Sequence, residues 1–166
     1  MECRENLEFL VEYHPFHESI KKSILEEKYN FLYNPLVDGY NSNIRAYRTL
    51  GDLNTKGIKL VKEWISTLIR QHYPGFDYNI GAWIAKYNKG DYTLEHDHIP
   101  SGFSFVYFVK TPKGSSPLVF STSGKRIMAE EGKVVIFPSM LKHHVPYNHS
   151  EDRIILSGNM IPVRQV

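Results

Sequence analysis

The spacing of apolar residues along the chain changes near Pro74, from a helical repeat to a strand repeat. Beyond Pro74, short apolar or alternating runs are separated by Gly, Pro, Asn and Ser, a pattern typical of β-strands. About eight strands after helical elements predict a sandwich or jelly roll of the cupin-like kind. The expected strands are Tyr78–Tyr87, Thr93–His98, Ser104–Lys110, Leu118–Ser121, Lys125–Ala129, Lys133–Pro138, His143–Val145 and Arg153–Asn159.

The segment before Pro74 contains two stretches with helical periodicity. The first predicted helix runs from about Pro15 to Lys28, with Phe16, Ile20 and Ile24 at four-residue intervals. Pro15 suits the first helical position because its missing N–H has no partner there.

The second predicted helix runs from about Thr55 to His72, and Pro74-Gly75 ends it. We expect its apolar stripe to pack in the core rather than to hold a cofactor, because amphipathic helices bury that face. The stripe consists of Ile58, Val61, Trp64, Ile65, Leu68 and Ile69.

Length and composition predict one domain. The chain has 166 residues, of which 42% are hydrophobic, and no repeat or proline-rich linker divides it. We therefore expect a single domain over residues 1–166, with residues 1–76 as a mostly helical support and residues 77–166 as the core. The predicted fold is mainly β with N-terminal helices, a jelly roll packed by one or two α-helices.

The charge distribution and the cysteine content limit the kinds of partner and the compartment that we expect. The 20 basic and 18 acidic residues are interspersed, so the sequence gives no strong nucleic-acid signal. No stretch approaches the roughly 20 apolar residues that cross a bilayer, so no membrane partner is expected. The single cysteine, Cys3, cannot form an internal disulfide, and the start lacks a basic region followed by an apolar one. These features predict a cytoplasmic protein.

Three histidines form a candidate metal site. His96 and His98 flank Asp97, and in a strand the side chains at i and i+2 share one face. His143 follows Pro138 at the end of another apolar strand, which can bring a third imidazole to the same ion. Imidazole suits Zn, Cu, Fe and Ni, so the ligand type alone does not choose the metal.

Two of these ligand assignments have alternatives. Asp97 faces away from His96 on a regular strand and could join it only through a bulge, so we favour His98 as the third ligand. His143 and His144 are adjacent, and only one of them can line the interior. We favour His143 because of its place after Pro138 and before Val145.

The chain from about Tyr78 to Met160 resembles the small non-haem Fe(II)- and 2-oxoglutarate-dependent oxygenases, which are built on a double-stranded β-helix. It is similar to phage-borne and bacterial members in particular, and a phage-encoded protein would act in the host cytoplasm. The resemblance rests on the order and spacing of five segments, which are residues 87–92, 96–98, 104–108, 132–146 and 153–157.

The resemblance implies roles for several residues. It makes His96 the first iron ligand and His143 the distal one. Arg153 would bind the far carboxylate of 2-oxoglutarate through its planar guanidinium. Ser157, on the same face of that strand, could add a hydroxyl, and Tyr87 stands where related enzymes often place another contact to the co-substrate.

Position 98 departs from the family pattern, in which an aspartate or glutamate completes a two-histidine, one-carboxylate triad. A third imidazole, His98, leaves the site one positive charge richer. The resemblance implies Fe(II), 2-oxoglutarate and O2 as cofactor and co-substrates, and hydroxylation of a C–H bond with release of succinate and CO2. No catalytic residue is expected beyond the metal centre. The aromatic side chains Tyr92, Tyr107 and Trp83 could line the substrate pocket.

Other functions fit the same sequence. A three-histidine cupin-type dioxygenase would need no 2-oxoglutarate, and three histidines with a water on zinc would make a hydrolase site. A non-catalytic β-sandwich module is a further alternative. The sequence does not distinguish among substrate classes. It is compatible with a peptide side chain, a small metabolite or a nucleobase. The N-terminal helices could also form a homodimer interface.

Overall fold

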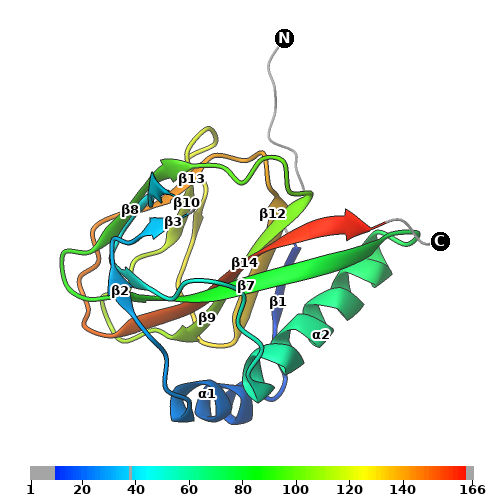
Figure 1. The fold of residues 1–166 in the computed structure, drawn as a ribbon, viewed down its shortest axis with the longest axis horizontal. Coiled ribbons are helices and arrows are strands. Elements are labelled where there is room, and N and C mark those ends of the chain that lie inside the picture. Colours follow the sequence, from blue (N-terminus) through cyan, green and yellow to red (C-terminus); the bar gives the residue numbers. More distant parts are fainter. Residues whose placement is uncertain (1–9, 38, 164–166) are drawn as a thin grey trace.

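The described residues of the computed structural model, 10–37 and 39–163, form two facing antiparallel sheets, a separate two-stranded pair and two helices (Figure 1). Helix α1 spans His17–Glu26, and helix α2 spans Lys56–His72. The strands are β1 (Leu10–Tyr13), β2 (Leu32–Tyr33), β3 (Leu36–Val37), β4 (Tyr40–Asn41), β5 (Ile44–Arg45), β6 (Tyr47–Arg48), β7 (Asp77–Tyr87), β8 (Tyr92–His96), β9 (Phe103–Lys110), β10 (Leu118–Phe120), β11 (Arg126–Ile127), β12 (Lys133–Pro138), β13 (His143–Val145) and β14 (Arg153–Val163).

The strands after α2 alternate between the two sheets. The larger sheet has the order β1-β12-β9-β14-β7-β6-β2, and the smaller has the order β11-β10-β13-β8-β5. In chain order, β7, β9, β12 and β14 lie in the larger sheet, while β8, β10 with β11, and β13 return through the smaller one. This alternation is the winding of a double-stranded β-helix. The predicted fold class, mainly β with N-terminal helices, is therefore confirmed.

One hydrophobic core lies between the helices and the outer face of the larger sheet. Ile58, Val61 and Ile65 of the predicted α2 stripe have no exposed surface and share this core with Phe105 of β9. The helices approach each other closely at Gly57, where a Cβ would lie 2.9 Å from Cγ1 of Ile24. Glycine is therefore required sterically at this crossing.

The second core fills the space between the two sheets. Val106 and Phe108 of β9 point into it, whereas their neighbours Phe105 and Tyr107 point to the helices. This division follows from the period of two in a β-strand. Phe137 of β12 packs in the inner core. The candidate functional residues lie around the same inter-sheet space.

The N-terminal segment contributes more than helices. Strand β1 pairs with β12, β6 pairs with β7, and β5 pairs with β8. Both sheets therefore contain strands from before and after residue 76, although the sequence predicted a mostly helical support there. The helices begin at His17 and Lys56, within the predicted ranges. Strand β14 continues to Val163, beyond the predicted end, because it pairs with β7 along that whole length.

Neither helix in the described ranges combines the length and the apolar character that a membrane span requires. Cys3, one of the features that predict a cytoplasmic protein, lies outside the described residues.

Candidate active site

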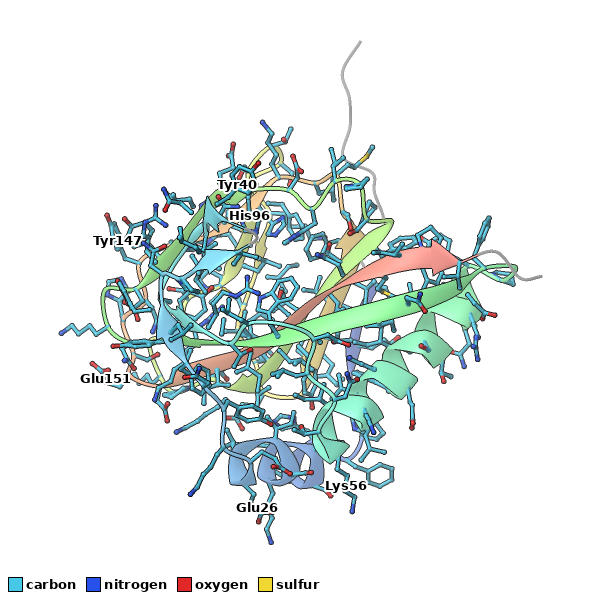
Figure 2. The ribbon with its side chains drawn as sticks, viewed as in Figure 1. Glu26, Tyr40, Lys56, His96, Tyr147 and Glu151 are labelled. Carbon is cyan, nitrogen blue, oxygen red and sulfur yellow. The ribbon has the colours of Figure 1, made fainter. Side chains whose placement is uncertain are left out.

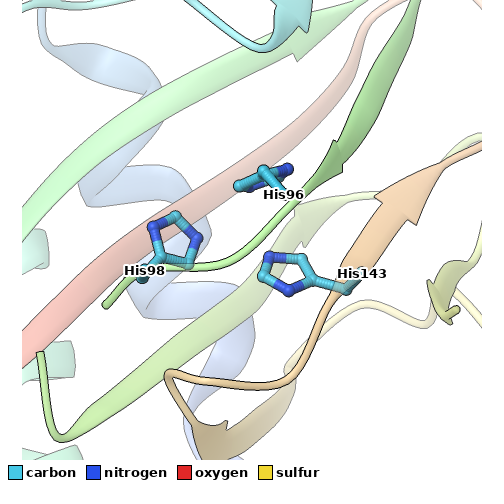
Figure 3. A group of neighbouring side chains, drawn as sticks. All are labelled: His96, His98 and His143. Carbon is cyan, nitrogen blue, oxygen red and sulfur yellow. The ribbon is translucent and has the colours of Figure 1, made fainter. Parts of the chain in front are cut away.

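The structure brings the three predicted histidines together at one end of the inter-sheet space (Figure 3). His96 ends β8 and His143 begins β13, and these two residues are paired across the smaller sheet. His98 follows two residues after the end of β8. One side-chain nitrogen from each histidine lies within 4.8 Å of the other two, and the ring centroids are 4.4 to 5.1 Å apart.

Backbone carbonyls fix the orientation of two of these rings. Nδ1 of His96 lies 2.7 Å from the carbonyl oxygen of Leu94, and Nδ1 of His143 lies 2.8 Å from that of Leu141. A carbonyl oxygen only accepts, so each Nδ1 carries the proton and each Nε2 keeps a lone pair. Metal-binding histidines are held in this way, with the second ring nitrogen donating to a carbonyl or carboxylate.

His98 is held by its backbone and by neighbouring rings. Its backbone N–H donates to the carbonyl oxygen of Ser139 at 2.8 Å, and its ring lies 6.1 Å from the Trp83 ring. Burial, followed by the neighbouring His96 and His143, lowers the pKa of His98 to about 2. Burial also lowers the pKa of His143 to about 4. At neutral pH the site therefore presents neutral imidazoles, the form that binds a metal ion.

The alternative ligands lie outside this group. The Asp97 carboxylate borders the cavity, but it accepts the backbone N–H of Ile99 at 3.1 Å. His144 is paired with Val119 of β10, and its Nδ1 lies 3.1 Å from the Ser121 hydroxyl. Neither residue belongs to the three-histidine group that the described part of the chain assembles.

A cavity of about 460 Å³ lies between the sheets beside the histidines. This volume is within the range of small-molecule sites, roughly 300 to 1,000 Å³. Trp83 of β7 and Ser157 of β14 line it from the larger sheet, and Thr93 of β8 lines it from the smaller. The β3–β4 pair borders it through Val37 and Asn41.

Arg153, the first residue of β14, is fully buried, and it is not itself among the residues that line the cavity, although it packs against one that is. Its guanidinium carbon lies 4.6 Å from the ring centroid of Tyr87, which lines the cavity, and 5.6 Å from that of Phe108. Its Nε donates to the carbonyl oxygen of Ser116 at 3.0 Å. The two terminal nitrogens have no hydrogen-bond partner among the described residues.

The unpaired guanidinium of Arg153 indicates an anion site. Burial lowers its pKa to about 10, so the group remains charged at neutral pH. A buried charge without a partner costs several kcal/mol in effective terms. The terminal nitrogens form a planar fork that matches the two oxygens of a carboxylate. The residues present therefore fit a ligand that carries a carboxylate to the Tyr87 end of the cavity.

The other two residues predicted to bind the co-substrate also line the cavity. The Tyr87 hydroxyl lies 2.6 Å from Oγ1 of Thr93, so it is already engaged in a buried hydrogen bond. Ser157 donates its hydroxyl to the carbonyl oxygen of Phe105 at 3.3 Å. Both side chains can contact a ligand. Thr93 is a further polar residue that lines the cavity, and no sequence pattern pointed to it.

The three aromatic residues that were predicted to line the substrate pocket lie in different parts of the structure. Trp83 lines the cavity. Tyr107 points to the opposite face of the larger sheet, where its hydroxyl lies 2.6 Å from Nδ1 of His17. Tyr92 packs its ring against Tyr147, with centroids 4.8 Å apart, and is not among the residues that line the cavity. Of the three, only Trp83 is placed to contact a ligand there.

Two further residues that line the cavity were not predicted from the sequence. Arg48 of β6 lies over Trp83, with its guanidinium carbon 4.6 Å from the ring centroid, and its charge helps to lower the pKa of His98. Asn159 of β14 accepts a hydrogen bond from the Ser104 hydroxyl at 2.9 Å. Arg48 and Asn159 reach the cavity because strand pairing brings segments that are distant in the sequence to the same place.

Asp152 anchors the start of β14 next to Arg153. Its carboxylate pairs with Lys110 of β9 and, at 3.3 Å, with Lys86 of β7, the two strands that flank β14. The hydrogen bond from Lys110, with that from Lys86, holds the pKa of Asp152 below its usual value. The resulting stability is therefore present above the ordinary aspartate pKa of about 3.9 and is lost as the pH falls through the lower folded value.

We expect Asp152→Asn to lower the melting temperature at pH 6 and to converge with the wild type as the pH falls through the lowered pKa of Asp152. Thermal unfolding followed between pH 2 and pH 7 measures this difference. The control is Glu151→Gln at the exposed neighbouring position (Figure 2), which should match the wild type throughout. A difference for Asp152→Asn that stays constant with pH would show that its ion pairs are not the cause.

Comparison with known proteins supports the fold. No protein-family model matches the chain, and no curated protein matches its sequence. Among solved structures, the chain is similar to a viral collagen prolyl hydroxylase from Paramecium bursaria Chlorella virus-1, solved as a 2-oxoglutarate complex. The two are 14% identical with a TM-score of 0.68, and the match covers 94% of this chain and 97% of that one.

Two further structures show the same likeness. An oxidoreductase of the 2OG-Fe(II) oxygenase family from Burkholderia pseudomallei is 12% identical with a TM-score of 0.69, covering 92% of this chain and 85% of that one. A Trichoplax adhaerens prolyl hydroxylase in complex with a hypoxia-inducible factor peptide fragment is 13% identical with a TM-score of 0.71, covering 93% and 84%. The chain therefore has the fold of these oxygenases over nearly its whole length.

Proposed function

We propose that this protein is an Fe(II)- and 2-oxoglutarate-dependent oxygenase that hydroxylates a C–H bond of its substrate and releases succinate and CO2. In this proposal His96, His98 and His143 hold the iron. Arg153 binds the far carboxylate of 2-oxoglutarate, and Tyr87 and Ser157 border the same ligand. The fold of the similar oxygenases and the histidine group support this function.

The observation that carries the proposal is the fully buried Arg153 with two unpaired terminal nitrogens. A folded protein keeps such a charge at a cost unless a ligand completes it. A metal ion held by three neutral histidines does not by itself explain why a second cation, the Arg153 guanidinium, is buried nearby. A ligand with a metal-binding end and a distant carboxylate explains both, and 2-oxoglutarate has that structure.

The residues of the chain have distinct tasks in this reaction. When bound, Fe(II) with 2-oxoglutarate and O2 supplies the oxidising power for C–H hydroxylation. The carbonyls of Leu94 and Leu141 keep the Nε2 lone pairs of His96 and His143 directed at the ion. Arg153 orients the co-substrate through its carboxylate. Apolar lining residues of the inner core, Val106 among them, exclude water from the space between the sheets.

We infer a peptide side chain as the first substrate class to test. The similar viral protein is named a collagen prolyl hydroxylase, and the Trichoplax enzyme was solved with a peptide fragment. Because the β3–β4 pair borders the cavity, an extended chain could lie beside it. A small metabolite or a nucleobase is the alternative. Prolyl peptides are therefore the first compounds to add once basal turnover has been measured.

The test is succinate formation by metal-stripped protein after addition of Fe(II), ascorbate and 2-oxoglutarate, with no substrate present. Slow uncoupled turnover should appear only when both iron and 2-oxoglutarate are supplied. A prolyl peptide that increases the rate and gains one oxygen atom in mass would identify the substrate class. Absence of succinate, together with no effect of 2-oxoglutarate on thermal unfolding, would contradict the proposal.

One observation favours a second candidate function. All three clustered donors are histidines, the ligand set of a three-histidine cupin-type dioxygenase or of a zinc hydrolase. A dioxygenase of that type would consume O2 with its substrate but without 2-oxoglutarate, and a hydrolase would consume no O2. Neither function explains the unpaired Arg153, so both rank below the 2-oxoglutarate reaction.

A further inference from the structure

We propose that the protein has a second divalent cation site, formed by His17, Glu18 and Glu131 and suited to Zn²⁺. The donor atoms of these three residues lie within 4.8 Å of one another. His17 and Glu18 begin α1, and Glu131 lies in the turn before β12. Helix α1 lies at the opposite end of the molecule from β8 and β13 (Figure 1), so this site is separate from the active-site histidines. The proposal does not depend on the proposed function.

His17 is the residue that indicates a ligand. Its side chain is only 10% exposed, and its Nε2 is buried without a hydrogen-bond partner among the described residues. Its other nitrogen, Nδ1, lies 2.6 Å from the Tyr107 hydroxyl. When Nδ1 donates to the Tyr107 oxygen, Nε2 carries an unused lone pair. A cation bound to Nε2 would satisfy this lone pair.

The distances fit a bridging ion better than a hydrogen bond. Nε2 of His17 lies 3.7 Å from Oε2 of Glu131, which is too long for a hydrogen bond. Two donors that are each about 2.1 Å from a tetrahedral zinc ion are roughly 3.4 Å apart. A small movement would therefore place both atoms on one ion. Glu18 is exposed and free to rotate its carboxylate toward the same position.

Lys21 is the competing partner at this site. Its ammonium lies 2.7 Å from Oε2 of Glu131, the same oxygen that the ion would bind. The Lys21 side chain is 24% exposed, so it can turn toward solvent when a metal ion arrives. The other carboxylate oxygen of Glu131 accepts the backbone N–H of Thr111 at 3.1 Å and keeps the carboxylate in place. Lys21 should therefore weaken zinc binding without preventing it.

A zinc ion here would connect α1 to the larger sheet. His17 contacts Tyr107 of β9, and Glu131 precedes β12, so the ion would join the helix to two neighbouring strands. His17 also fits closely against Gly132, where a Cβ would lie 2.9 Å from the histidine Cβ. This close approach holds His17 in place, so only side-chain adjustments are needed to complete the site, and zinc should raise the stability of the folded state by mass action.

The test is the zinc stoichiometry and affinity of the full chain, measured by competition with a chromophoric chelator. The wild type should bind two equivalents. Glu18→Gln, which alters an exposed side chain, should retain one tight equivalent and weaken the other at least tenfold. Lys21→Met should tighten that same equivalent. Glu26→Gln, at the exposed far end of α1 (Figure 2), is the matched control and should change neither equivalent.

His143→Ala provides the complementary measurement, because it should remove the active-site equivalent and leave the α1 equivalent intact. The combined His143→Ala and Glu18→Gln variant should bind no zinc tightly. A wild type that binds a single equivalent, and loses it in His143→Ala, would overturn the proposal. Two equivalents that are unaffected by both Glu18→Gln and Lys21→Met would overturn it as well, because the second ion would then lie elsewhere.

Discussion

Replacement of Arg153 by methionine should abolish 2-oxoglutarate-dependent succinate formation while leaving the protein at least as stable as the wild type. The guanidinium is fully buried, and two of its nitrogens have no partner in the described structure. Apolar replacement of a whole buried ion pair is often neutral or stabilising by about 1 to 4 kcal/mol, and Arg153→Met leaves no unpaired anion behind, only the Ser116 carbonyl without its donor. Loss of one partner from a buried charge pair costs about 2 to 5 kcal/mol in binding, or roughly 30- to 4,000-fold in Kd.

Two measurements check this prediction, namely the melting temperature without ligand and the Kd for 2-oxoglutarate in the presence of Fe(II). Arg45→Met is the matched control. Arg45 donates to the Asn34 side chain and to the carbonyl of Ser42, so its loss should lower the melting temperature but preserve 2-oxoglutarate binding. An Arg153→Met protein that is strongly destabilised, or that still binds 2-oxoglutarate normally, would contradict the role proposed for this arginine.

His143→Ala should remove tight metal binding at the active site and with it all turnover. His143 supplies one of three neutral donors, and its ring is oriented by the Leu141 carbonyl. Loss of a residue that merely orients a ligand costs about 10- to 100-fold in metal affinity, so loss of the ligand itself should exceed that range. Metal content after dialysis and the succinate assay measure the effect.

The neighbouring residue provides the control. His144 lies on the same short strand but contacts Ser121, outside the histidine group. His144→Ala should therefore retain metal and activity. The reverse result, with activity lost in His144→Ala and kept in His143→Ala, would assign the distal ligand to the other histidine. Equal loss in both variants would indicate disruption of β13 rather than removal of a ligand.

Long periodic segments were predictable from the sequence because their burial pattern repeats. The apolar stripe of α2 and the strands Asp77–Tyr87 and Lys133–Pro138 match the predicted ranges to within a residue or two. The spacing of His96, His98 and His143 also predicted side chains that do meet in space. Such features depend on local periodicity and on strand alternation, which a single sequence contains.

The face assignment of β9 was not predictable in the same way. All residues from Ser104 to Val109 are buried, because one face meets the helices and the other meets the inner core. A strand buried on both faces has no alternation of apolar and polar residues to show which side is the cavity. Tyr107 was therefore a pocket candidate by sequence, although it lies toward α1 and α2.

The short N-terminal strands were missed for a different reason. Strands of two residues, such as β5 and β6, are too short to show a period of two and form only because longer strands offer them an edge. Arg48 reaches the cavity through this pairing. Its position therefore depends on contacts between segments that are far apart in the chain, which local sequence patterns do not encode.

The histidines and the arginine belong to opposite sheets, since His96 and His143 lie on β8 and β13 and Arg153 lies on β14. Packed sheets are about 10 Å apart, a distance set by the side chains between them. Under the proposed function, a keto acid must be long enough to reach from one sheet to the other. The packing of side chains between the sheets would then determine which length of keto diacid the protein accepts. Substitutions at inter-sheet residues such as Phe137 would alter that length.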